Sequence, residues 1–387
     1  MRKTILLAFA LLLAANALSQ EKQAIIRVKN PLGLDRPGEI VSVPWKHIKT
    51  KLPSLDPAAM SIREAQSNVD LVYQVVDYNE DGNPDELVFQ SSYKAGETKE
   101  FVVKQASEKA STFQPLTDAR FVTPREDLAW ENDRIAFRMY GPALAKEVNN
   151  GIDIWTKRVR YLIVDKWYKG EEQDPKISYH EDHGEGADYF SVGRSLGAGA
   201  CALLKDDSLY QPGVFAKHRI IATGPLQAIF ELTYNPVVYE GKRITEVMRI
   251  TLNAGVNLNR IDVAFSSESG KGKVAFASGI VKRKGTATSG DKKAGWTSLW
   301  GLTTDKEEIG YLGTGIVMPR AALKVVKEDS VHALIIGKAE LGNSFTYYAG
   351  AGWTRSGDFA SAEDWTNYLT EFAQRVQTPL VVRILTR

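Results

Sequence analysis

Ile250-Thr-Leu-Asn-Ala-Gly-Val-Asn-Leu-Asn-Arg-Ile-Asp-Val-Ala-Phe265 is the stretch that decides the fold class. It contains the end of one run of β-forming residues, 242–252, and the start of another, 258–267. Ala254 and Gly255 lie between the two runs, where a turn is expected. Two such runs joined by a turn predict paired antiparallel strands.

Similar runs continue on both sides of this pair. Their spacing predicts a large antiparallel β-sandwich over residues 120–387. Five shorter runs near the N-terminus predict a separate small β-domain over residues 20–115, with a polar boundary around Pro115 and Pro124. The further runs of the sandwich are 216–234, 274–281, 308–317, 333–337 and 345–350, and those of the small domain are 24–28, 39–43, 71–76, 86–89 and 100–104.

One helix is expected near the C-terminus. Ser361 and Asp364 have the spacing of a capping box, and Pro379 ends the helical pattern. Apolar residues at helical intervals form one stripe between these points. The stripe consists of Trp365, Leu369, Phe372 and Val376.

The ends and the charge of the chain restrict where the protein acts. Residues 1–19 have two early positive charges, a short apolar run and a small-residue cleavage motif, which together predict a signal peptide. We therefore expect an exported protein, periplasmic or secreted. The chain has 49 Lys and Arg against 47 Asp and Glu, and removing Arg2 and Lys3 with the leader leaves 47 against 47. This balance argues against nucleic-acid or membrane partners.

The densest group of polar residues spans 179–193. Glycines there predict a loop, and loops on rigid sheets commonly carry binding and catalytic groups. The alternative is a solvated acidic loop. A zinc site is less favoured, because the two histidines lack the helical His-Glu-x-x-His register and no third ligand is identified. The candidate catalytic residues are His180, His183, Tyr189 and Glu185, and Asp182 and Asp188 are candidate substrate-binding residues.

Basic and aromatic residues precede this loop. A strand over 132–140 would place Arg134, Arg138 and Tyr140 on one face, where arginine forks could bind an anionic sugar. The alternative is that these arginines pair with neighbouring carboxylates. Aromatic rings stack on sugar faces, although a tryptophan in a β-protein is more often part of the core. The further candidates for substrate binding are Trp155, Lys157 and Trp167.

One loop near the N-terminus resembles the opening of a calcium site. Asp77, Asn79, Asp81 and Asp85 provide oxygen side chains at the right positions, but Val88 stands where a calcium loop needs its bidentate Glu. The competing interpretation, slightly favoured, is a plain turn whose side chains serve the backbone. No cofactor is expected to be required, and a structural calcium ion is the one candidate.

Three long motifs carry a resemblance to a known family. They are residues 130–142, 151–157 with Trp167 and Tyr168, and 179–193. Together they resemble a bacterial family, formerly of unknown function, from polysaccharide-utilisation loci, which includes the ulvan oligosaccharide dehydratase. The stretch 250–265 also resembles the sandwich domains of polysaccharide lyases and mutarotase-like proteins.

The resemblance implies a carbon-oxygen lyase that removes water, as the 4-hydroxyl and the C5 proton, from the non-reducing-end uronic acid of an anionic oligosaccharide, leaving a 4,5-unsaturated sugar. Such a site must neutralise the carboxylate, and the candidates are Arg134, Arg138 and Lys157. His180 and His183 are the first choices for acid and base, Tyr189 the second, and Glu185 or Asp182 would orient a histidine. The competing classes are a non-catalytic carbohydrate-binding module and a glycoside hydrolase using Asp182, Glu185 and Asp188.

Overall fold

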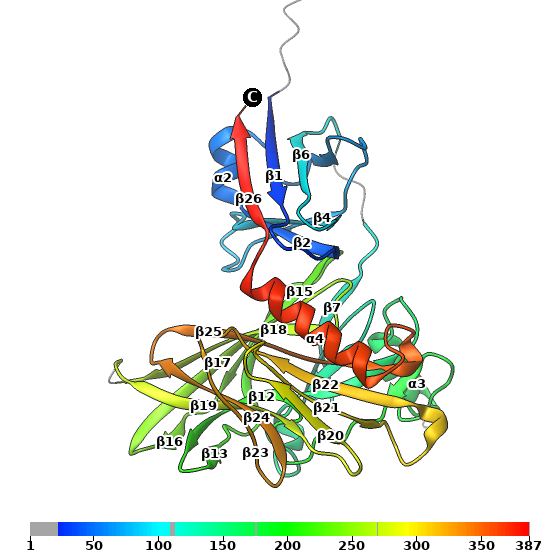
Figure 1. Cartoon of the computed structure of the whole chain (residues 1–387), viewed down its shortest axis with the longest axis vertical. Helices are drawn as coiled ribbons and strands as arrows, with labels where there is room; N and C mark the ends of the chain where they lie inside the picture. Colours follow the sequence, from blue (N-terminus) through cyan, green and yellow to red (C-terminus); the bar gives the residue numbers. More distant parts are fainter. Residues whose placement is uncertain (1–21, 109–112, 175, 269, 387) are drawn as a thin grey trace, which may run out of the picture.

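A computed structural model describes residues 22–108, 113–174, 176–268 and 270–386 of the chain (Figure 1). The predicted signal peptide, 1–19, lies outside the described residues. Within them the chain is mainly β, with antiparallel sheets and one long helix near the C-terminus, which confirms the predicted fold class. No helix in this part of the chain combines the length and the apolar character needed to cross a bilayer.

The N-terminal module, as we call the first two sheets, has a core of its own (Figure 1). One sheet has the order β26-β1-β6-β3 and the other β2-β5-β4. The two sheets enclose the large apolar side chains Trp45, Phe89 and Phe101. The elements are β1 (Gln23–Lys29), β2 (Arg36–Pro44), α2 (Trp45–Lys51), β3 (Met60–Glu64), β4 (Tyr73–Val76), β5 (Glu86–Tyr93), β6 (Thr98–Gln105) and β26 (Val381–Thr386).

The sandwich begins with a five-stranded sheet of order β11-β10-β9-β8-β7 and a second of order β13-β12-β19-β24-β23. A parallel bridge between Ile152 and Gly197 links the residues that immediately precede β10 and β12. The strands of the first sheet are β7 (Thr117–Val122), β8 (Asp127–Asn132), β9 (Ala136–Met139), β10 (Asp153–Lys157) and β11 (Gly186–Asp188), and the helices η1 (Pro142–Leu144) and α3 (Val164–Gln173) lie in the segments that connect them. The strands of the second sheet are β12 (Ala198–Lys205), β13 (Ser208–Tyr210), β19 (Lys273–Val281), β23 (Leu323–Glu328) and β24 (His332–Glu340).

Both five-stranded sheets pack on one face of a nine-stranded sheet, whose order is β14-β15-β17-β18-β25-β22-β21-β20 with β16 beside β17. Alternate residues of β18 point into this core, and Trp130 of β8 donates its indole N–H to Asn259 Oδ1 at 2.7 Å. The remaining elements are β14 (Phe215–Ala222), β15 (Gln227–Tyr234), β16 (Val237–Tyr239), β17 (Lys242–Asn253), β18 (Leu258–Ser267), β20 (Ala287–Asp291), β21 (Trp296–Leu302), η2 (Glu307–Ile309), β22 (Tyr311–Val317), β25 (Ser344–Trp353), η3 (Thr354–Ser356) and α4 (Ala362–Gln377).

On the other face of the nine-stranded sheet, α4 covers β21 and β22 and crosses between the sandwich and the N-terminal module (Figure 1). The predicted capping box is present, because Ser361 accepts from the Asp364 backbone N–H and Asp364 accepts from the Ser361 N–H. Trp365 and Leu369 are fully buried against β21 and β22. The sequence therefore predicted this helix and the first two residues of its buried stripe, whereas Phe372 and Val376 are half-buried and the third buried residue is Ala373.

The last strand returns to the beginning of the chain. The sequence grouped residues 120–387 as one domain, but β26 pairs antiparallel with β1 and completes the first sheet of the N-terminal module. Arg36 strengthens this link by donating to the Thr378 carbonyl at the end of α4. The N-terminal module is therefore formed by both ends of the described chain, and the sandwich is formed by the residues between them.

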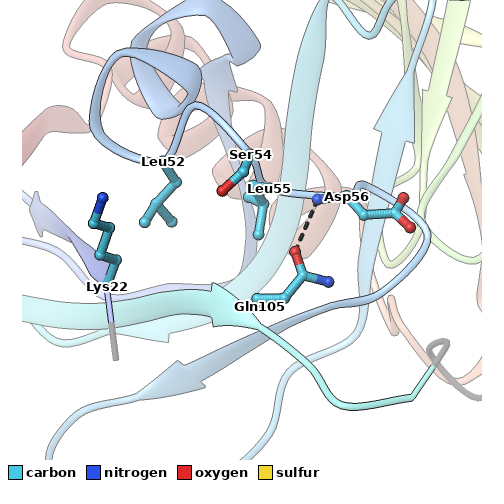
Figure 2. A pocket seen from close by; sticks show the side chains of 6 residues that line it. All are labelled: Lys22, Leu52, Ser54, Leu55, Asp56 and Gln105. Atoms are coloured by element: carbon cyan, nitrogen blue, oxygen red, sulfur yellow. Dashed lines mark hydrogen bonds between the residues drawn. The ribbon is translucent and has the colours of Figure 1, made fainter. Parts of the chain in front are cut away.

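A pocket of about 400 Å³ lies within the N-terminal module, and Figure 2 shows the side chains that line it. Leu52 and Leu55 line it, and Gln105 accepts a hydrogen bond from the Asp56 backbone N–H at 2.9 Å. The Asp56 carboxylate points away from Lys22, so charged groups do not converge there.

Candidate functional site

The predicted site residues gather around β10 and the edge strand β11 of the first five-stranded sheet. Because side chains alternate along a strand, Trp155 and Lys157 of β10 lie on the face covered by α3, whereas Ile154 faces the sandwich core. Gly186 of β11 approaches β10 so closely that a Cβ would lie 2.0 Å from the Thr156 carbonyl oxygen. A glycine with positive φ is required there, and it draws the histidine loop against the sheet.

Lys157 lies inside the protein instead of at a binding surface. Its ammonium contacts Glu131 Oε2 and the Asn132 carbonyl, each at 2.6 Å, and the residue is 1% exposed. Glu131 also accepts from the backbone N–H groups of Ile163 and Val164, so it caps the start of α3. Burial lowers the pKa of Lys157, and Glu131 opposes that shift. The pair holds α3 in place and leaves Lys157 no path to a substrate.

A second buried ion cluster surrounds Arg138. Its guanidinium contacts Asp153 at 2.6 Å, Asp188 at 2.7 Å and the Tyr140 hydroxyl at 2.8 Å. Asp127 lies 3.7 Å away. Burial, and then the neighbouring Asp153, raise the pKa of Asp188, while Arg138 lowers it. Arg138 and Tyr140 are therefore together on one face, as the strand pattern predicted, but their polar atoms are used within the protein.

Arg134, the third residue predicted for that face, lies elsewhere. The expected strand 132–140 is interrupted, because Asn132 Oδ1 accepts from the backbone N–H groups of Arg134 and Ile135 and forms a turn between β8 and β9. Arg134 instead pairs with Asp133 and, at 2.6 Å, with Asp358 after η3. The alternative in which these arginines pair with carboxylates therefore describes both Arg134 and Arg138.

Trp155 is the centre of an aromatic stack beneath α3. Its ring lies 4.7 Å from Tyr179 and 5.5 Å from Trp167, and it is fully buried. Trp155 is thus a core residue and cannot stack on a sugar from this position. Trp167 is partly exposed and donates its indole N–H to Glu185 at 3.1 Å. Glu185 also accepts from Lys166 at 2.7 Å and from the Tyr161 hydroxyl.

The two histidines of the loop differ in their support. His180 is held through Nδ1, which lies 3.1 Å from the Asp188 carbonyl oxygen and 3.4 Å from its carboxylate. The His180 side chain is 57% exposed, and within the described residues its ring is bonded through Nδ1 alone. His183 is exposed and bonded through Nε2 to the Ser178 carbonyl. His180 is therefore oriented by Asp188, chiefly through its backbone carbonyl, and Nε2 is left for a ligand.

Tyr189 follows β11 and lies among charged and aromatic groups at the open edge. Its ring is 6.2 Å from Trp353, at the end of β25, and Arg355 lies 5.9 Å over the same tryptophan. Burial and the Asp182 carboxylate raise the pKa of Tyr189, whereas Arg355 and Arg158 oppose the shift. Tyr189 therefore stays protonated beside two arginines.

Arg158 and Asp182 complete this edge. Arg158 Nη2 donates to Asp182 Oδ1 at 3.1 Å, and the same oxygen accepts from the Gly184 and Gly186 backbone N–H groups. Arg158 Nε and Asp182 Oδ2 are buried and have no hydrogen-bond partner among the described residues. Buried polar groups are normally satisfied, so both atoms remain available for a ligand or a water molecule.

The predicted calcium residues serve the backbone of their own loop. Asp77 accepts from the Glu80 and Gly82 N–H groups, Asp81 from Asn83, and Asp85 from Tyr78. Asn79 accepts from Asp81 in the same way. Over residues 22–108, 113–174, 176–268 and 270–386, no three His, Cys, Asp or Glu side chains are grouped to hold a metal ion. These bonds are those of the plain turn.

The sequence reasoning missed Arg158, Arg355, Trp353 and Asp153. Arg158 is adjacent to the selected Lys157 and could have been found, since residues that follow one another in a strand point to opposite faces. Asp153 stands in the motif 151–157 and shares a face with Trp155. Arg355 and Trp353 carry no local signal, because they reach the site from the other end of the chain.

The fold of the antiparallel sandwich has a known counterpart. A protein of glycosyl hydrolase family 38 from Enterococcus faecalis matches it with a TM-score of 0.52 and 12% identity, over 98% of this chain and 50% of the other. An α-mannosidase from E. faecalis V583 gives a TM-score of 0.44 at 8% identity, over 98% and 49%. The chain thus spans about half of each structure, and the first match shows that the fold is shared.

Sequence comparison gives the family. The model of the domain of unknown function DUF4861 matches residues 28–382, and the chain belongs to this family. A relative, the uncharacterized protein P7 of Formosa agariphila, is 31% identical over 403 residues, covering 99% of this chain and all of the relative. The family assignment agrees with the expected membership of a family of formerly unknown function.

Proposed function

We propose that this protein is an exported carbohydrate-active enzyme that removes water from the terminal uronic acid of an anionic oligosaccharide. The product would be a 4,5-unsaturated sugar. The observation that carries the proposal is the grouping at one edge of the sheet of the Tyr189 ring, 6.2 Å from Trp353, with Arg355, 5.9 Å over the same tryptophan. The shared fold with a glycosyl hydrolase family 38 protein and the predicted leader are consistent with this function.

The arginines would perform the first task of the reaction. The C5 proton of a uronate is weakly acidic while the adjacent carboxylate is charged and unpaired. Arg355 and Arg158, whose side chain is 28% exposed, could neutralise that carboxylate. They take the role that the sequence assigned to Arg134, Arg138 and Lys157.

His180 and Tyr189 would move the protons. The Asp188 carbonyl accepts the Nδ1 proton of His180, so the lone pair on Nε2 can take the C5 proton as the C5–H electrons form the C4=C5 bond. The C4–O bond breaks in the same elimination, and Tyr189 donates its phenolic proton so that the hydroxyl leaves as water. The raised pKa of Tyr189 keeps it in the protonated form that this role requires.

The test is absorbance at the unsaturated-uronate band, with mass spectrometry, on purified protein and saturated uronate-terminated oligosaccharides. We expect a rising band and the loss of one water. His180→Ala and Tyr189→Phe should each reduce the rate about 100-fold or more, the usual contribution of a positioned acid or base. His183→Ala is the matched control, because it removes an exposed histidine that is bonded only to a backbone carbonyl.

Other products would overturn the proposal. A new reducing end without the chromophore would indicate a glycoside hydrolase, and binding with no chemical change would indicate a binding module. A glycoside hydrolase needs two carboxyl groups that are free to act on the substrate. The three candidate carboxylates are each paired with a cation, which argues against a hydrolase: Asp182 with Arg158, Glu185 with Lys166, and Asp188 with Arg138.

A further inference from the structure

A cleft of about 590 Å³ separates the N-terminal module from the sandwich. Strand β2 forms one wall, and the exposed face of β17, β18 and β25 forms the other. The C-terminal turns of α4 close one end. None of the residues proposed for the elimination lines it.

Positive charge in the cleft is incompletely paired. Arg375, on the last turn of α4, forms no ion pair with a carboxylate within the described residues, and its buried Nε has no acceptor there. Burial lowers the pKa of Arg36. Glu39, 3.6 Å away, raises this pKa, and the nearby Arg375 lowers it. The cleft lining carries four arginines, Arg36, Arg249, Arg260 and Arg375, against three carboxylates, Glu39, Glu86 and Asp262. The remaining positive charge favours an anionic ligand.

The opposite wall supplies groups suited to a sugar. Gln227 is 7% exposed and donates through Nε2 to Asn253 at 2.9 Å, but its Oε1 has no partner in the described chain. A buried amide oxygen without a donor can accept a hydroxyl hydrogen. Tyr348 and Phe372 lie edge to face at 5.1 Å and offer aromatic surface in the same cleft. Arg260, 53% exposed and paired with Asp262 at 2.9 Å, lies on the same wall.

We propose that this cleft is a second binding site, which takes an acidic sugar residue of an oligosaccharide. The carboxylate or sulfate of the ligand binds Arg375 and Arg260, and a sugar hydroxyl donates to Gln227. The site is separate from the one around Tyr189, because α4 begins near that edge and its 16 residues extend about 24 Å towards the cleft. Binding here does not depend on the elimination reaction.

The test is hydrogen exchange of the whole protein, followed by mass spectrometry, in trigalacturonate or neutral maltotriose. Trigalacturonate should slow exchange at least about 3-fold in segments 36–42 and 372–382, and maltotriose should not. Arg375→Gln should weaken the trigalacturonate dependence about 10-fold, as expected for one charge-assisted contact. Arg383→Gln is the matched control, an exposed arginine on β26 outside the cleft lining.

Each outcome decides the proposal. Absent protection in both segments, or equal protection in Arg375→Gln and the control, overturns it. If Arg375→Gln unfolds, Arg260→Gln provides the same comparison from the opposite wall. Inorganic sulfate in a separate arm distinguishes the source of the charge: protection by sulfate alone means that the cleft binds free anions and overturns the saccharide assignment. Protection by trigalacturonate in a Tyr189→Phe variant supports the second site even if no elimination is detected.

Discussion

Lys157 and Arg158 are neighbours in the chain but lie in opposite environments. Lys157 is buried against Glu131 and helps to fix α3, whereas the Arg158 side chain is 28% exposed and meets Asp182 at the open edge. Asp188 and Tyr189 are also consecutive residues with different surroundings: the Asp188 side chain belongs to the buried Arg138 cluster, and the Tyr189 ring lies beside Trp353 at the open edge. Charge in the sequence motifs therefore serves two purposes, holding the sheet together on one face and offering donors to a ligand on the other.

The largest expected effect is on the buried side. Lys157→Met leaves the Glu131 carboxylate buried without its cation, which should lower the free energy of unfolding by about 3–5 kcal/mol. Urea unfolding followed by circular dichroism measures this. Lys169→Met, which removes an exposed pair with Asp165, should cost about 0.5 kcal/mol or less. Equal effects of the two variants would contradict the structural role of Lys157.

A buried carboxyl group without a cation extends the comparison. Glu246 is 4% exposed in the sandwich core, and burial raises its pKa to about 8. The folded state keeps this proton while the unfolded state releases it near pH 4.5, so stability should fall as the pH rises from about 4.5 to about 8. Glu246→Gln should remove a pH-dependent loss of a few kcal/mol, at about 1.4 kcal/mol per pKa unit. If the free energy of unfolding depends on pH in the same way in the wild type and the variant, Glu246 does not titrate in this range.

On the open side the effect should fall on activity. Arg158→Gln removes one of the two cations proposed to neutralise the substrate carboxylate, so kcat/KM should fall about 100-fold with little change in stability. The measurement is the rate of unsaturated-uronate formation, with thermal unfolding recorded in parallel. Arg194→Gln, another exposed arginine in the same part of the chain, is the control. A variant that loses stability and keeps its rate would reverse the roles assigned to Lys157 and Arg158.

The smallest effect is expected at the loop 77–85. Because its carboxylates already accept backbone N–H groups, calcium should shift the melting temperature by less than about 1 °C relative to a chelator. Differential scanning fluorimetry in CaCl2 and in EDTA tests this. A rise of several degrees, lost in Asp77→Asn, would establish a structural calcium ion instead.

The strands and α4 could be predicted because their signals are local. The 250–265 stretch forms the facing ends of β17 and β18, and the Ser361 capping box lies within four residues of the helix it begins. Helix α3 was missed for the opposite reason: it has no side-chain N-cap of its own, and its first amides bond to Glu131 from another strand. Its start is therefore specified by a contact between distant parts of the chain.

The sequence by itself determined the alternating strands, the C-terminal helix and the chemical types of residue in the histidine loop, because periodicity and capping depend on neighbouring residues. The tertiary structure alone decided which charges are accessible. Packing beneath α3 buried Trp155 and Lys157, the return of the chain paired β26 with β1, and the end of β25 brought Arg355 close to Tyr189. Solvent exposure depends on what packs against a residue from elsewhere in the chain, and no local pattern contains that information.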